Sequence, residues 1–171
     1  MGSRTENARL VGDERKVKIL VDTNVMVAGL VVLHPHHGSA EPWLKSIQSG
    51  QIKLVLAAHN LAEVYSSLTS LPIKPRISPP IAWSMISQNV IPHARFESLP
   101  VAEYQSLVQK LSQAGLGGGI VYDGLIARVA ELAGVDLLVT FNVSHFLQVW
   151  PAGAGRIVSP LTTPPPIPPR V

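Results

Sequence analysis

Short apolar runs alternate along the chain with segments whose apolar positions recur at helical spacing. Five short segments predict strands, the last of them at an edge of the sheet: 17–21, 52–57, 94–99, 135–140 and 156–159. The segments between them predict helices, and these span residues 24–30, 39–50, 60–71, 79–90, 101–115 and 120–134. Strands that alternate with helices indicate an α/β fold with a mostly parallel sheet and helices on both faces.

Composition bounds the domain organisation. The chain has 171 residues, 46% of them hydrophobic and 15% charged, which favours one globular domain with a sizeable core. We expect this domain to span residues 17–158. A polar N-terminal arm (1–16) would precede it and a proline-rich tail (159–171), extended or disordered, would follow.

Charge and cysteine content narrow the partners and cofactors. The net charge of +3 permits a nucleic-acid partner without demanding one, because no block of Lys and Arg stands out. The chain has no cysteine, so oxygen and imidazole ligands remain for any metal, which favours Mg²⁺ or Mn²⁺. The N-terminal residues carry no secretion signal, and the apolar run "VMVAGLVVL" is too short to span a bilayer. We therefore expect a cytoplasmic protein without a membrane partner.

Four polar side chains stand alone in long stretches of the chain that otherwise lack charge. Asp22 is the only charged residue in 19–40, and it follows directly on a predicted strand. Three more candidates sit just past a strand or in the first turn of a helix: Glu63, Asp123 and Asn142. Because ligands bind at the carboxyl ends of strands in an open α/β sheet, we expect these four groups to meet at that edge.

Three acids that converge in apolar surroundings cannot all stay ionised unless a cation joins them. Carboxylate oxygens suit Mg²⁺ or Mn²⁺, and such an ion can activate water for attack on a phosphate. The pattern therefore favours a metal-dependent nuclease or phosphatase. Each residue also has a plainer interpretation. Asp22 is also suited to capping the short helix that follows it, Asn142 to a turn or a cap, Asp123 to a helix N-terminus, and Glu63 to a capping box begun by Asn60.

Three segments resemble the successive motifs of PIN-domain nucleases: "ILVDTNVMVAGL", "AEVYSSL" and "YDGLIARVAELAGVDLLVTFNVSHF". They are most similar to the VapC-type ribonuclease toxins of toxin–antitoxin pairs. The resemblance covers about residues 17–158. It implies a three-layer α/β/α fold with a roughly five-stranded parallel sheet, and Mg²⁺- or Mn²⁺-dependent hydrolysis of RNA phosphodiester bonds. It also implies a small antitoxin partner and a homodimer.

Carried over by position, the resemblance implies that Asp22, Glu63 and Asp123 are the metal-binding and catalytic acids. Asn142 falls where many members have Asp and others Asn, and Asn24 and Thr140 match polar residues that support the acids. An amide can bind a metal through oxygen but cannot act as a general base, so we expect one well-bound ion. His145 has two interpretations, a group that approaches the phosphate or leaving group and a structural residue before Phe146; the second is preferred, and His145 is left out of the catalytic set.

Asn142 keeps a second function open, which is a PIN fold with a weakened site that binds RNA or protein without cutting it. A third alternative is a phosphatase or nucleotide hydrolase on a similar sheet. The glycine-rich segment "GLGGGI" (115–120) lacks the Gly-Lys-Ser/Thr of a P-loop. It predicts a flexible loop, and a possible gate, before the helix of Asp123.

Overall fold

The computed structural model describes residues 15–166. Most of the predicted N-terminal arm (1–16) and the end of the predicted tail (159–171) lie outside the described residues, so these two boundaries stay predictions. In the described part of the chain, no helix is long and apolar enough to cross a membrane.

Five parallel strands form a single sheet in the order β3-β2-β1-β4-β5. Their bounds are β1 Lys18–Val21, β2 Lys53–Ala57, β3 Ala94–Glu97, β4 Leu137–Val139 and β5 Ile157–Val158. The predicted α/β class, the parallel sheet of about five strands and the edge position of the last strand are confirmed. β1 lies at the centre, so its carboxyl end opens directly beside that of β4.

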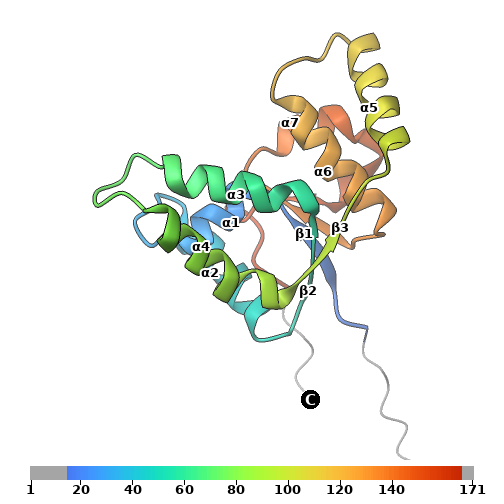
Figure 1. The fold of residues 1–171 in the computed structure, drawn as a ribbon. Coiled ribbons are helices and arrows are strands. Elements are labelled where there is room, and N and C mark those ends of the chain that lie inside the picture. The colour runs from blue at the N-terminus through green and yellow to red at the C-terminus, as the bar shows by residue number, and fades with distance from the viewer. Residues whose placement is uncertain (1–14, 167–171) are drawn as a thin grey trace, which may run out of the picture.

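Two layers of helices enclose the sheet, as Figure 1 shows. One layer contains α1 Thr23–Leu30, α2 His37–Gln48, α3 Ala58–Ser70 and α4 Pro79–Asn89. The other contains α6 Ile120–Leu132 and α7 Val143–Val149, with α5 Val101–Gln113 packed outside α6. Two 3₁₀ turns, Ile91–His93 and Pro151–Arg156, join elements. The sequence did not predict α7 or these turns.

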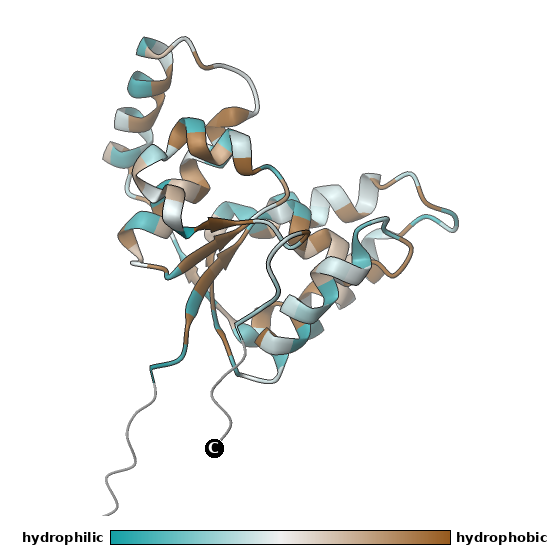
Figure 2. Cartoon of the chain, turned by 180° about the vertical axis from the view of Figure 1, so that it is seen from behind, coloured by the Kyte–Doolittle hydropathy of each residue, from teal (hydrophilic) through white to brown (hydrophobic). Residues whose placement is uncertain are grey.

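β1 shows why its sequence is a continuous apolar run. Ile19 and Val21 pack into the core beneath α1–α4, whereas Leu20 between them packs into the core beneath α6 and α7. All three are buried, because successive side chains of a strand point to opposite faces and helices cover both faces here. Figure 2 shows the result as brown strands between helices that carry teal outer surfaces.

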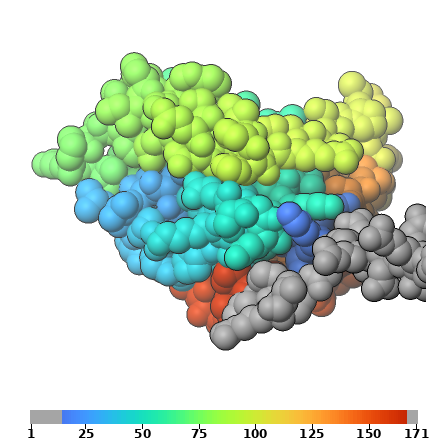
Figure 3. All heavy atoms as spheres, turned by 90° about the horizontal axis from the view of Figure 1, so that it is seen from below, coloured from blue at the N-terminus to red at the C-terminus, as the bar shows by residue number. Residues whose placement is uncertain are grey.

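Near the end of the sheet where the strands begin, α2 and α4 contact each other within the α1–α4 layer. Gln48 of α2 donates a hydrogen bond to Asn89 of α4 across 3.2 Å. Figure 3, viewed from below, shows this end, with the green atoms of α4 over the cyan atoms of α2 and β2. The opposite end, where the strands finish, carries the polar residues that the sequence singled out.

Candidate active site

Asp22 lies at the carboxyl end of β1, at the centre of the sheet. Its backbone N–H donates to the carbonyl of Val139 in β4 (2.9 Å), and its side chain is only 4% exposed. Thr140 Oγ1 donates a 2.7 Å hydrogen bond to Asp22 Oδ2. Asp22 occupies the cap position of α1, but its side chain makes no capping hydrogen bond there. The carboxylate is therefore not explained by helix capping.

Burial raises the pKa of Asp22 from 3.8 to about 6. Hydrogen bonds from Thr140 and from the backbone of Thr23 lower it in part, and the negative charges of Asp123 and Glu63 raise it further. The three carboxyl groups thus act on one another through space, although they come from distant parts of the chain. Strongly perturbed pKa values of this kind are common among the carboxyl groups of active sites.

Glu63 lies in the second turn of α3 and is tied to the start of α1. Thr23 Oγ1 donates to Glu63 Oε2 (2.8 Å), and Asn60 Nδ2 donates to Thr23 Oγ1 (2.9 Å). The predicted capping box is wrong in its register, because α3 begins at Ala58, directly after β2. Asn60 is instead the third helical residue, and its Oδ1 accepts a hydrogen bond from the backbone N–H of Ala57 (3.1 Å). Glu63 is left free of any capping role.

Asp123 lies in the first turn of α6, and its Oδ2 is 3.2 Å from Nδ1 of His145 on α7. Burial raises the pKa of Asp123, the contact with His145 lowers it, and the charge of Glu63 raises it. The interpretation of His145 as a structural residue is wrong. Its side chain is more than half exposed beside an acid of the site, and it is the next residue, Phe146, that is fully buried in the core.

The three polar residues predicted to accompany the acids surround the end of β4. Thr140 is fully buried, and besides donating to Asp22 its hydroxyl accepts from the backbone N–H of Asn142 (2.9 Å). Asn24 accepts from the backbone N–H of Phe141 (3.4 Å), so it supports the loop after β4 and not an acid directly. Asn142 occupies the cap position of α7 without a side-chain capping bond, and it lines the cleft.

A cleft of about 1050 Å³ joins these groups between α3 on one side and α6 and α7 on the other. Its walls include all four predicted ligands: Asp22, Glu63, Asp123 and Asn142. Within residues 15–166, however, no three His, Asp or Glu side chains are gathered closely enough to form a ready-made metal cluster. The acids therefore share one cleft while each of them is bonded to another side chain of the protein.

The glycine-rich segment contributes one wall of the cleft, as its position before α6 suggested. Gly115, Gly117 and Gly119 line the cleft, and Gly115 adopts a left-handed backbone conformation (φ +68°) that favours glycine. His59 and Tyr122 also line it, and sequence reasoning missed both. The position of Tyr122, directly before Asp123, was the available signal for that residue.

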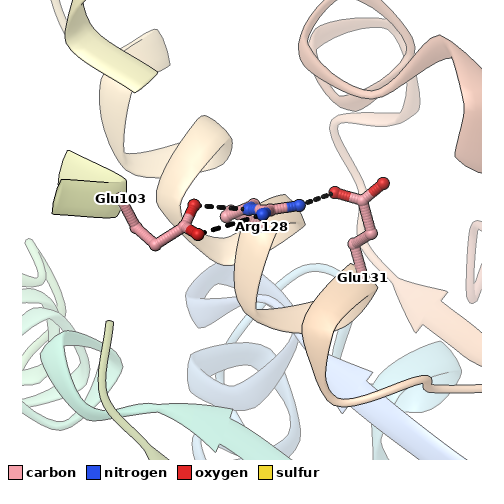
Figure 4. A network of polar contacts seen from close by, with 3 residues as sticks. All are labelled: Glu103, Arg128 and Glu131. Atoms are coloured by element: carbon pink, nitrogen blue, oxygen red, sulfur yellow. Dashed lines mark hydrogen bonds and ion pairs between the residues drawn. The ribbon is translucent and has the colours of Figure 1, made fainter. Parts of the chain in front are cut away.

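The helix that carries Asp123 is held on another face by α5. Arg128 of α6 donates two hydrogen bonds to Glu103 of α5 (2.7 and 3.0 Å) and also pairs with Glu131, as Figure 4 shows. Hydrogen bonds from Glu103 and Glu131 raise the pKa of Arg128 above its usual range. The pair with Glu103 attaches α5 to α6 away from the cleft, whereas the pair with Glu131 lies within α6.

Comparison with known proteins agrees with this arrangement. The family model described as the PIN domain matches residues 19–149. The chain belongs to the PIN-domain family. It is also 32% identical over 120 residues to "Ribonuclease VapC40" of Mycobacterium tuberculosis, covering 70% of this chain and 84% of that protein. The resemblance to VapC-type PIN domains is therefore confirmed.

Solved PIN-domain structures share the fold at lower sequence identity. The structure of FitAcB from Neisseria gonorrhoeae aligns with a TM-score of 0.60 at 20% identity, over 85% of this chain and 99% of that one. VapC20 of Mycobacterium tuberculosis, described as a toxin that cleaves the sarcin–ricin loop, aligns with a TM-score of 0.55 at 17% identity. It covers 70% of this chain and 86% of its own. These likenesses confirm the three-layer architecture.

Proposed function

We propose that this PIN domain is a ribonuclease that hydrolyses RNA phosphodiester bonds with the help of a carboxylate-bound Mg²⁺ or Mn²⁺ ion. The observation that carries the proposal is the meeting of Asp22, Glu63 and Asp123 in one cleft, where burial and mutual repulsion raise the pKa of two of them. The names of relatives such as Ribonuclease VapC40 supply the substrate class.

The donor set of the cleft fits a hard divalent cation. Three carboxylates and the amide oxygen of Asn142 are oxygen ligands of the kind that Mg²⁺ and Mn²⁺ prefer, and the cleft walls contain no thiolate. All three carboxylates already have side-chain partners, since Asp22 accepts from Thr140, Glu63 accepts from Thr23 and Asp123 contacts His145. When bound, such an ion polarises the scissile phosphate and lowers the pKa of water.

The side chains of the protein prepare this site in distinct ways. The Thr140 hydroxyl orients Asp22, and the pair of Thr23 and Asn60 orients Glu63 from the start of α1 and α3. Asp22 and Asp123 are the two candidates to accept a proton from the attacking water, since both carboxyl groups line the cleft.

RNA incubated with the purified protein tests the proposal. We expect single-stranded RNA to be cleaved with Mg²⁺ or Mn²⁺, and cleavage to stop when EDTA removes the ion. Bound but intact RNA would contradict the proposal and favour the alternative of a binding module. Hydrolysis of small phosphomonoesters without RNA cleavage would favour a phosphatase.

We also propose that the chain is the toxin of a toxin–antitoxin pair, that it forms a homodimer, and that a small antitoxin binds it. Support comes from the VapC-type relatives and from VapC20, which is described as a toxin. Light scattering on the isolated chain should give twice its 18.4 kDa mass. Induced expression should arrest growth of a bacterial host, and a monomeric or harmless chain would contradict these proposals.

A further inference from the structure

We infer that Tyr122 and His59 form a stacking site for an unpaired nucleobase beside the scissile phosphate of the substrate. This inference rests on the proposed ribonuclease function, because it names a feature of the RNA that the same cleft would recognise. It also assigns a role to two residues that the carboxylate chemistry does not use.

The described walls of the cleft carry acidic but no Lys or Arg side chains. The acids are Asp22, Glu63 and Asp123. Nucleic-acid binding ordinarily draws much of its affinity from contacts between basic side chains and phosphates. A substrate that enters this acidic cleft needs another source of affinity, and stacking of bases on aromatic rings is the usual one for single strands.

The position of Tyr122 supplies such a surface. It is the only Phe, Tyr or Trp among the described residues that line the cleft, and it is 51% exposed. It directly precedes Asp123, a proposed catalytic acid, in the first turn of α6. An exposed aromatic ring at this place has no core to pack in, and it is available to a ligand.

His59 faces Tyr122 from the opposite wall of the cleft. It belongs to the first turn of α3, and its ring centroid lies 6.5 Å from that of Tyr122, with the ring planes at 42°. At this separation the two tilted rings are in aromatic contact with each other, so His59 supports the Tyr122 ring from one side. The base then stacks on the exposed part of the Tyr122 ring.

Two variants of Tyr122 and one control test the inference on a single-stranded RNA oligonucleotide with one cleavage site. Tyr122→Leu removes the ring and keeps an apolar side chain, whereas Tyr122→Phe keeps the ring. Tyr104→Leu makes the same change at a tyrosine of α5 that is 38% exposed and lies outside the cleft. We expect Tyr122→Leu to lower kcat/KM by about 5- to 150-fold, the range that loss of one base–aromatic stack gives. Tyr122→Phe and Tyr104→Leu should stay close to wild type.

Substrates with an abasic nucleotide on either side of the cleaved bond separate stacking from a general structural effect. The abasic site should slow the wild type by a similar factor and should slow Tyr122→Leu little, because the stack is already lost. Equal kcat/KM for wild type and Tyr122→Leu, or an abasic penalty of the same size in both, would overturn the inference while leaving the ribonuclease function intact.

If the wild type cleaves no RNA, the proposed function fails first, and binding then tests the stacking site separately. Fluorescence anisotropy of the same oligonucleotide in EDTA should show tighter binding to wild type than to Tyr122→Leu. Equal affinity, or no binding by either protein, would overturn the stacking site as well.

Discussion

Replacing Asp22 by Asn removes a buried negative charge while keeping the shape of the side chain. The pKa of this carboxyl rises from 3.8 in the unfolded chain to about 6 in the fold, so the folded protein without metal holds its proton more tightly. Stability from Asp22 is therefore fully present below pH 3.8 and is lost as the pH rises through about 6. The Asn variant lacks this titration.

The size of the effect follows from the two pKa values. The difference between 3.8 and about 6 corresponds to about 3 kcal/mol at high pH. The Asn variant does not gain all of this free energy of unfolding. Its amide oxygen can accept from Thr140, but its amide nitrogen cannot accept a second hydrogen bond. Loss of such a bond costs about 1 kcal/mol. We expect Asp22→Asn to stabilise the metal-free protein by about 2 kcal/mol at pH 8.

Urea unfolding of both proteins in EDTA, at pH 4 and at pH 8, measures this difference. The stability of the variant relative to wild type should grow by about 2 kcal/mol between the two pH values. Asp136→Asn is the matched control, since Asp136 accepts hydrogen bonds from the backbone of Lys18 (2.8 Å) and from Arg15 (2.6 Å). That variant should be less stable than wild type at pH 8.

A gap between wild type and Asp22→Asn that stays constant or shrinks as the pH rises would refute the reasoning. It would mean that the Asp22 carboxylate is already well stabilised by the protein alone. Addition of Mn²⁺ at pH 8 tests in a second way whether the Asp22 charge needs a cation. The ion should stabilise wild type more than the variant, because only wild type offers it the Asp22 charge.

Three further changes test the surroundings of the site. Thr140→Val removes the hydrogen bond that lowers the pKa of Asp22, so NMR titration of the metal-free variant should show that pKa above about 6. Gly153→Ala places a Cβ within the indole of the neighbouring buried tryptophan and should cost about 1–3 kcal/mol in urea unfolding, whereas Gly155→Ala, with open space around it, should cost far less. Arg128→Met breaks the ion pair with Glu103 that joins α5 to α6, together with the pair with Glu131 inside α6, and should cost about 1 kcal/mol or less, with the loss diminishing at high salt.

Much of the fold could be predicted from the sequence because burial leaves a clear mark on short strands. β1 is apolar at every position from Ile19 to Val21, and such a short β-branched run is typical of a strand covered on both faces. α7 escaped prediction because only Phe146 of its seven residues is buried, which leaves no periodic stripe to read. The start of α3 was misplaced because Asn60 favours a cap position, whereas here it reaches back to the strand from inside the helix.

The meeting of the acids could also be expected, since isolated charges after parallel strands point to one edge of the sheet. Their partners could not. The contact between His145 and Asp123 joins residues 22 positions apart, and Thr23 reaches Glu63 across 40 positions. No periodicity links such pairs, because they depend on how α1, α3, α6 and α7 are placed around the sheet.

Cleavage of single-stranded RNA in Mn²⁺ by wild type and by Glu63→Gln and Asp123→Asn tests the shared role of the acids most directly. Glu97→Gln is the control, since this carboxylate pairs with Arg95 at the end of β3 and does not line the cleft. We predict cleavage by wild type and by Glu97→Gln, and a loss of cleavage in both cleft variants although they remain folded. Cleavage at the wild-type rate by either Glu63→Gln or Asp123→Asn would contradict the proposal that these carboxylates act together.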